Sequence, residues 1–464
     1  RFYKASFLHT TLESVSGSEV VQVTLPIGMD GAEVKVHFVY DPVMGARDQQ
    51  KFKEIRTFKA FSTEGTPISG RAGISPTGFY GVFELNGKQI MIRPGAVEQD
   101  MYVVYDMGRK LSMLDFSLLA GCGTETHLNE IKRNETVNLR SDDKRMRNFT
   151  IAISCTSGYA DQVGRSEGQV MASVVEVLNL LNYRYNVDFG IKLNLLDGTS
   201  QLFNLDPHTD YFVNETKGLE LLQQNQDFLD SLIDNSSYDL AQVFTRGCSD
   251  VGGVVWGRTC VSDTKARGVS CRTNDSDYFF TTFKHEVGHQ FSGGHTFNAC
   301  NGSTQYNPFS SFEPGAGSTI LSYGDNCGSD NVGERVDYFH VANIIEVSRY
   351  VKEIENKCGT WGAEINHTPV GYLSMPEDKT IPILTPFELE GGATDDDKNL
   401  TFNWEQYDLG EGEPLGTNFE TGPLFVSQAP GGVGYRLFPS LSTINSGIIS
   451  IRERLPEVSR EMNF

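Results

Sequence analysis

The sequence predicts a multidomain protein in which a central α/β domain is flanked by an amino-terminal β-rich domain and a carboxyl-terminal β-sandwich. Three observations support this fold class. The chain has 464 residues, enough for two to four domains that each bury a core. Apolar and polar residues alternate near both ends, which is the period of a half-buried strand. In the middle of the chain, apolar residues also recur at helical spacing.

Residues 1–120 are predicted to form the β-rich domain. Apolar and polar side chains alternate over residues 34–40, as in a strand with one buried face. Asn86-Gly87 lies between two apolar runs and predicts a hairpin, because both residues tolerate positive φ. Residues 121–147 are polar and of mixed charge, so we expect a linker there.

Residues 148–360 alternate between strand and helix patterns, which predicts a layered α/β domain. An apolar helical face begins at Val170 in a long segment without proline, and a second amphipathic helix is expected over residues 217–233. A further helix is expected to begin near Tyr278. The predicted strands are Phe149–Ser154, Phe189–Leu196, Leu240–Thr245 and Gly253–Gly257.

Residues 361–464 are predicted to form the β-sandwich. Apolar and polar residues alternate from Leu400 to Trp404. The acidic turn just before this segment contains Asp395, Asp396 and Asp397, whose clustered oxygens could bind Ca²⁺. A plain Asp-rich turn is the alternative.

Charge and composition exclude several classes of partner. The net charge of −21 argues against sequence-independent binding to nucleic acid or anionic membrane. No apolar run reaches the roughly eighteen residues of a membrane span. The chain begins at Arg1 without a Met or an apolar leader, so we expect a processed or truncated product. Eight widely spaced cysteines fit a few disulfides in a secreted protein.

The most specific pattern is the motif His285-Glu286-x-x-His289, with His295 six residues later. On a helix, His285 and His289 lie on one face, one turn apart. A Ser-Gly-Gly turn can bring His295 back as a third nitrogen ligand, which leaves one tetrahedral position open, as catalytic zinc requires. Glu286 can then reach a metal-bound water. The alternative is a surface helix with unrelated histidines.

This motif resembles that of the metzincin zinc endopeptidases, HExxHxxGxxH followed by a turn that contains Met. Its surroundings look most like the secreted, reprolysin-like metalloproteases of Bacteroidetes, and the resemblance covers nearly the whole chain. It implies Zn²⁺ as cofactor, protein or peptide substrates, a prodomain-like amino-terminal region and an Ig-like carboxyl-terminal domain. The matching stretches beyond the motif include Lys265–Val269, Glu313–Ile320, Tyr338–His340 and Trp404–Gln406.

Two positions depart from the metzincin pattern. Ser292 stands where Gly is usual, and Leu321 stands where the turn Met is expected. That Gly has a positive φ, which strains a residue with a Cβ. The bend therefore either shifts onto Gly293 and Gly294 or leaves Ser292 strained. Leu and Met have similar volumes, so we expect the apolar floor below the zinc to survive.

The resemblance also implies a mechanism and a latent state. Glu286 activates a zinc-bound water that attacks the peptide carbonyl. Tyr323 matches a Tyr that helps bind the oxyanion in some metzincins, with a simple packed Tyr as the alternative. Cys122 could occupy the open zinc position of a latent enzyme, because a thiolate is a strong zinc ligand. A disulfide to the catalytic domain or a plain buried Cys is the competing interpretation.

Cys300 and Cys327 bracket the loop after the metal helix and are our candidates for one disulfide.

A second class of function remains open at this point. A non-catalytic adhesin or binding protein can keep a protease-like fold. Loss of Glu286 or of a ligand would favour that class, but all four motif residues are present. Hydrolysis by a secreted zinc metalloendopeptidase is therefore the leading hypothesis.

Overall fold

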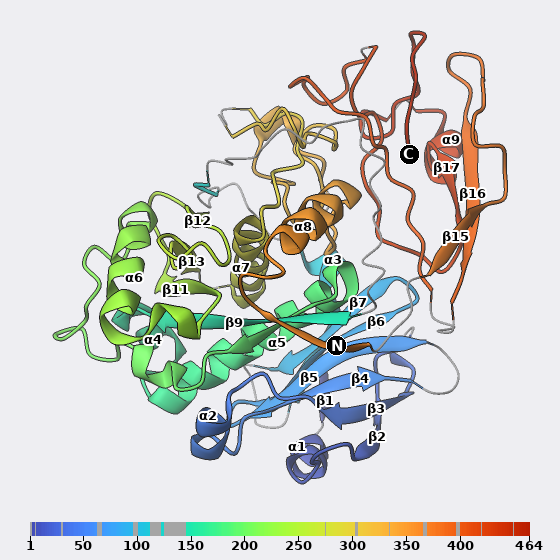
Figure 1. The fold of residues 1–464 in the computed structure, drawn as a ribbon. Helices are drawn as coiled ribbons and strands as arrows, with labels where there is room; N and C mark the ends of the chain where they lie inside the picture. Colours follow the sequence, from blue (N-terminus) through green and yellow to red (C-terminus); the bar gives the residue numbers. More distant parts are fainter. Residues whose placement is uncertain are drawn as a thin grey trace.

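The structure is a computed structural model of the chain. In Figure 1 the amino-terminal sheet (blue) lies at the bottom and the α/β unit (green to yellow) fills the left and centre, with the carboxyl-terminal unit (orange to red) at the upper right. Most of the predicted linker, residues 125–144, lies outside the described residues. These are 2–4, 6–28, 31–62, 67–95, 101–111, 122–124, 145–273, 275–301, 305–333, 335–364, 369–395, 400–418, 420–448 and 450–464.

Eight antiparallel strands form the amino-terminal sheet, in the order β1-β8-β7-β6-β5-β4-β3-β2. Asn86 and Gly87 have φ of 52° and 74° in the turn between β6 and β7, so the predicted hairpin is confirmed. The strands are β1 Phe2–Lys4, β2 Val20–Leu25, β3 Val34–Tyr40, β4 Arg56–Phe61, β5 Ile68–Ser75, β6 Gly78–Leu85, β7 Lys88–Pro94 and β8 Met101–Asp106, and the helices are α1 Ser6–Glu13, α2 Ala46–Lys51 and α3 Met107–Leu111.

The second sheet has the order β10-β9-β11-β13-β12, and β14 also pairs with β9. The pairs among β10, β9, β11 and β13 are parallel, whereas β12 and β14 are antiparallel to their neighbours. The strands are β9 Arg145–Cys155, β10 Ile191–Leu195, β11 Leu240–Arg246, β12 Gly253–Val255, β13 Gly268–Arg272 and β14 Thr360–Glu364. The helices are α4 Ser157–Val163, α5 Glu167–Phe189, α6 Gly218–Leu232, α7 Ser276–Gln290 and α8 Val341–Glu353.

Two predicted strand starts are wrong for identifiable reasons. β9 begins at Arg145 and not at Phe149, because β14 pairs with its first residues, a contact from far along the chain. Phe189 is the last residue of helix α5, not the start of a strand. Gly190 ends that helix with φ of 63°, a conformation that glycine adopts at low cost.

Helix α5 joins the two sheets into one core. Side chains of the amino-terminal sheet, including Tyr80 and Met91, belong to the same buried cluster as those of α5. A hydrogen bond from a charged side chain also connects the amino-terminal sheet to α5: Arg71 on β5 donates to the side chain of Asn179 at 2.7 Å. Because α5 is covered on two sides, it buries residues around most of its circumference.

The carboxyl-terminal unit contains one described sheet, in the order β15-β16-β17, and both pairs are antiparallel. Its strands are β15 Val370–Leu373, β16 Phe387–Thr394 and β17 Tyr435–Phe438, with helix α9 at Leu441–Ser446. The predicted strand from Leu400 to Trp404 is wrong, since its described pairing is one isolated bridge between Phe402 and Gly431. The Ig-like sandwich therefore stays a prediction.

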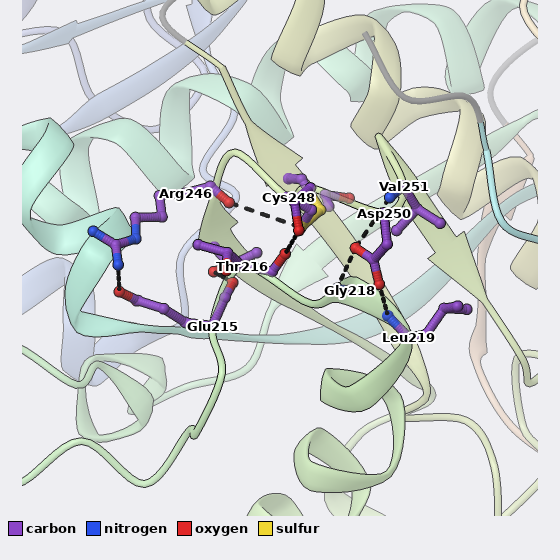
Figure 2. Close-up of a disulfide and its surroundings, with 12 residues drawn as sticks. Glu215, Thr216, Gly218, Leu219, Arg246, Cys248, Asp250 and Val251 are labelled. Atoms are coloured by element: carbon purple, nitrogen blue, oxygen red, sulfur yellow. Dashed lines mark hydrogen bonds and ion pairs between the residues drawn. A yellow bond between two sulfur atoms is a disulfide. The ribbon is translucent and has the colours of Figure 1, made fainter.

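Three disulfides lie in the α/β unit, and one of them joins a loop to strand β13. The predicted Cys300–Cys327 bond is present, together with Cys248–Cys271 and Cys260–Cys358. Figure 2 shows the loop that follows Cys248 and leads to β12. In this loop Asp250 accepts hydrogen bonds from the first amides of helix α6, at Gly218 (2.9 Å) and Leu219 (3.3 Å). The Cys248–Cys271 disulfide and the hydrogen bonds of Asp250 together fix the path of the chain that leads to β12. Within the described chain, no helix has the length and apolarity to cross a membrane.

Candidate metal centre

Helix α7 carries the first two motif histidines. Its first turn is capped by Asp275, whose carboxylate accepts hydrogen bonds from the amides of Asp277 (2.9 Å) and Tyr278 (3.1 Å). Phe283 and Val287 belong to the core that includes helix α5. The helix thus begins at a defined residue, and packing fixes its rotation.

The Nε2 atoms of His285, His289 and His295 converge on one point. They are 3.0 Å apart in the pair His285–His289, 3.1 Å in His289–His295 and 3.3 Å in His285–His295. Three nitrogens of a tetrahedral zinc site with bonds of about 2.0–2.1 Å lie about 3.3 Å apart. The spacing and the donor set therefore fit zinc.

Backbone carbonyls orient two of the rings. Nδ1 of His285 lies 2.7 Å from the carbonyl oxygen of Ile320, and Nδ1 of His289 lies 2.8 Å from that of Gly293. Donation from Nδ1 leaves the Nε2 lone pair directed at the centre. Burial lowers the pKa of all three imidazoles, to about 4 for His289 and well below the usual value for the other two. The rings are thus neutral at pH 7, the form that binds a metal.

A strained turn brings back the third histidine. Ser292 has φ of +69°, and the bend is not shifted onto the glycines that follow it. A residue with a Cβ in this conformation carries a strain of roughly 1–2 kcal/mol. The amide of Gly294 donates to Oε2 of Glu346 on helix α8 at 2.8 Å, so α8 holds the turn in position.

Leu321, predicted to form the apolar floor below the zinc, packs against the turn that follows helix α7. Its side chain is fully buried, and a Cβ added to Gly293 would lie 2.5 Å from its Cδ1. The Leu321 carbonyl also accepts a hydrogen bond from the amide of Thr296 at 3.1 Å. The turn around Leu321 thus packs directly against the loop of the third histidine.

Glu286 is buried beside the histidines and below strand β12. Burial raises the pKa of Glu286 to about 8, whereas hydrogen bonds with Cys122 and Thr124 lower it. A Cβ on Gly253 would lie 2.4 Å from Oε1 of Glu286, so the strand can approach this closely only with glycine there. A carboxyl group that titrates near neutral pH suits a general base and acid.

Cys122 lies at the centre and is not part of a disulfide. Its thiol is 3.7 Å from Oε2 of Glu286, and its Sγ and the ring nitrogens all lie within 4.8 Å of one another. Burial, with a smaller effect from Glu286, raises the pKa of the thiol, but a divalent cation would stabilise the thiolate. The disulfide interpretation of Cys122 is therefore wrong, and Cys155 is the other described cysteine outside a disulfide.

The segment around Cys122 adds to the sheet edge at β12. The amide of Gly123 donates to the Gly253 carbonyl at 2.9 Å, and the amide of Val255 donates to Oγ1 of Thr124 at 2.8 Å. Oγ1 of Thr124 also lies 3.3 Å from Oε2 of Glu286, to which it donates. We call residues 122–124 the cap. The cap thus contacts both the sheet edge and the buried glutamate.

Tyr323 packs against the ligand rings. Its ring centroid is 4.9 Å from that of His295 and 6.2 Å from that of His285. Its hydroxyl donates to the carbonyl oxygen of Cys122 at 3.2 Å and also contacts Gln305. Tyr323 therefore lies at the centre, with its hydroxyl engaged by the cap.

The predicted calcium site has no support in the described residues. Asp395 is described, whereas Asp396 and Asp397 lie outside the described ranges. Two groups of described side chains could hold a metal ion, the histidine centre and a group of Asp239, Cys260 and Cys358, and Asp395 is in neither. In the second group, the two cysteines are joined in a disulfide.

Residues 145–350 match the reprolysin-like metallopeptidases of family M12B. They form a reprolysin-like metallopeptidase domain. The match includes the three histidines, Glu286 and Tyr323, but not the cap. No curated protein sequence matches the chain.

Several residues at the centre of the reprolysin-like domain escaped the sequence analysis. Thr124 and Gly253 both lie against Glu286, and Glu346 holds the turn before His295. The Gly252-Gly253 pair was the one available signal, because glycine at a strand start often marks a close approach of another group. Nothing local marked Thr124 or Glu346.

Proposed function

We propose that the chain is a secreted zinc endopeptidase whose active site is covered by the cap. The convergence of three neutral imidazoles beside a buried glutamate carries this proposal. Three disulfides support secretion, because such bonds persist in oxidising compartments. A protease-like binding protein would not need to retain all four of these groups in one place.

Each side chain then has a role in peptide hydrolysis. His285, His289 and His295 would hold the zinc, which supplies a Lewis acid that polarises the peptide carbonyl. Glu286 takes a proton from the attacking water as the new C–O bond forms. It delivers that proton to the amide nitrogen as the C–N bond breaks. Tyr323, once its hydroxyl leaves the Cys122 carbonyl, donates to the substrate's developing oxyanion.

Strand β12 is the proposed binding edge for the substrate. The cap already bonds to this edge through Gly123 and Thr124, and an extended peptide can use the same backbone groups. Substrate and cap therefore compete for one place. In the covered state, the Cys122 thiolate is the proposed fourth zinc ligand.

The proposed domain division follows the sequence. Residues 1–120 are the prodomain-like region, 121–147 the linker, 148–360 the zinc peptidase and 361–464 an Ig-like domain. The start of β9 at Arg145 supports moving the peptidase boundary a few residues earlier. The antiparallel strands and the separate aromatic core of the last unit support a β-domain there.

Metal-dependent hydrolysis of casein tests the proposal. We expect zinc-loaded Cys122→Ala protein to cleave casein, and we expect a chelator or an added Glu286→Ala substitution to abolish cleavage. If Glu286→Ala cleaves as well as its parent, the mechanism is wrong. If neither the full chain nor Cys122→Ala cleaves casein or gelatin with zinc bound, the protease-like binding protein is the better interpretation.

A further inference from the structure

A small cavity lies beside Glu286 and His285, which both line it. Its volume is about 50 Å³. One wall is a face of helix α7, and the other is the chain after Leu321. Cys122 of the cap and Gly253 also line it. The remaining lining residues include Tyr278, Thr281, Thr282, Tyr323, Asn326 and Arg335.

Arg335 brings a positive charge to this cavity. Its Nη2 donates to the carbonyl oxygen of Tyr323. This bond fixes the guanidinium beside the turn that contains Leu321 and Tyr323. Gly324 has φ of +61°, and a Cβ there would lie 2.6 Å from Nε of Arg335. The Arg335 side chain therefore crosses the turn at a point where only glycine leaves room.

Burial lowers the pKa of Arg335, whereas Tyr278 and Asp325 raise it. An arginine with such surroundings stays charged at neutral pH, because its ordinary pKa is above about 12. Arg335 thus brings a cationic group, and Glu286 the catalytic carboxyl group, to the lining of one cavity.

We propose that this cavity binds the carboxylate side chain of a peptide residue close to the scissile bond, with Arg335 as its partner. The proposal rests on the proposed peptidase function and adds a substrate class to it: peptides with Asp or Glu at that position. A guanidinium binds a carboxylate through two parallel hydrogen bonds.

The size of the cavity agrees with this class. A single water molecule needs at least about 10–15 Å³ of cavity volume. A cavity of about 50 Å³ therefore has room for a group of a few atoms. An Asp side chain has four non-hydrogen atoms, and a Glu side chain has one more. An aromatic side chain would need the walls to move.

A purely structural role for Arg335 is the competing explanation, since its bond to Tyr323 could simply brace the turn. The two roles differ in what they do to substrate choice. Loss of a brace lowers cleavage of every peptide together. Loss of a binding group lowers cleavage of acidic peptides alone, and reversal of its charge changes the preference.

The test is a cleavage-site profile with a peptide library, read by mass spectrometry. Zinc-loaded full chain and its Cys122→Ala variant are the parents. We expect Asp and Glu to be enriched at one position near the cut bond. In Arg335→Gln, kcat/KM for acidic peptides should fall at least about tenfold relative to neutral ones, the size of a lost charge-assisted hydrogen bond. In Arg335→Glu, the enrichment should move to Lys and Arg.

Arg246→Gln is the matched control, because Arg246 is half exposed and pairs with Glu215 at 2.8 Å, away from the cavity (Figure 2). It should keep the parent profile. Arg335→Lys retains a cation and should keep part of the acidic preference, which guards against a variant that merely folds poorly. Parents that cleave without any acidic enrichment, or Arg335 variants that lose all peptides equally, would overturn the inference and leave the peptidase proposal standing. If neither parent cleaves any peptide, the peptidase proposal fails first and the inference falls with it.

Discussion

The two sides of the metal centre are built in different ways. The histidine side comes from the interior: α7 lies in the core, backbone carbonyls hold two rings, and Glu346 holds the turn of the third. The cap side is a short segment bonded to a sheet edge through two backbone amides. Any extended chain can make the backbone bond of Gly123, and a backbone carbonyl can accept from the Val255 amide in place of Oγ1 of Thr124. The ligand side is thus a fixed part of the fold, and the cap side is exchangeable.

The largest expected effect comes from the fixed side. Glu286→Gln in a Cys122→Ala background should lower kcat by about 10²–10⁴, the usual contribution of a general acid–base group. Zinc content should stay unchanged, because Glu286 is not one of the converging nitrogen donors. Peptide turnover and metal analysis on the same sample measure both. Loss of zinc together with activity would show that Glu286 has a different role.

Glu346, the buried acid that holds the turn before His295, should make the stability of the histidine side depend on pH. Burial raises the pKa of Glu346 to about 7, although Gly294, Asn343 and Arg349 lower it. The folded protein therefore binds this proton more tightly than the unfolded chain does. This contribution to stability is present below about pH 4 and is lost as pH rises through 7.

The Glu346→Gln variant should lack that decline. Relative to that of the parent, its free energy of unfolding should rise by up to about 3 kcal/mol between pH 5 and pH 8. Urea unfolding at the two pH values is the measurement. Parallel pH profiles for parent and variant would contradict the assignment.

The exchangeable side should respond more modestly. Cys122→Ala should raise the peptidase activity of the full chain about tenfold or more, since each tenfold corresponds to about 1.4 kcal/mol of lost cap binding. Cys155→Ala is the matched control, because Cys155 is the other described cysteine outside a disulfide and is fully buried. It should change stability without activating the enzyme. Equal activity in Cys122→Ala and the parent would remove the thiol from the latent state.

The smallest effect concerns the strained turn. Ser292→Gly should remove the strain at φ of +69° but adds freedom to the unfolded chain. The net gain in unfolding free energy should be about 0.5–1 kcal/mol. Thermal unfolding of zinc-loaded protein measures it. A loss of stability would mean that the Ser292 side chain makes a contact worth more than the strain.

Sequence reasoning worked where a feature is local. The helical spacing of His285 and His289, the hairpin at Asn86-Gly87 and the Cys300–Cys327 bridge all depend on residues that are close along the chain. It failed where contacts are distant. Cys122 meets Glu286 across 164 positions; the family resemblance offered this placement as one interpretation, but no period or spacing could choose it over a disulfide. The early start of β9 depends on β14 in the same way.

The core that helix α5 shares with the amino-terminal sheet bears on how the enzyme would be switched on. Tyr80 and Met91 are buried with α5, and Arg93 pairs with Asp277 at 3.0 Å and Glu176 at 3.2 Å. A single nick between residues 124 and 145 breaks none of these contacts. The nicked fragment would stay docked like a tight inhibitor, so the onset of activity would follow the rate at which it dissociates and not the rate of the cut.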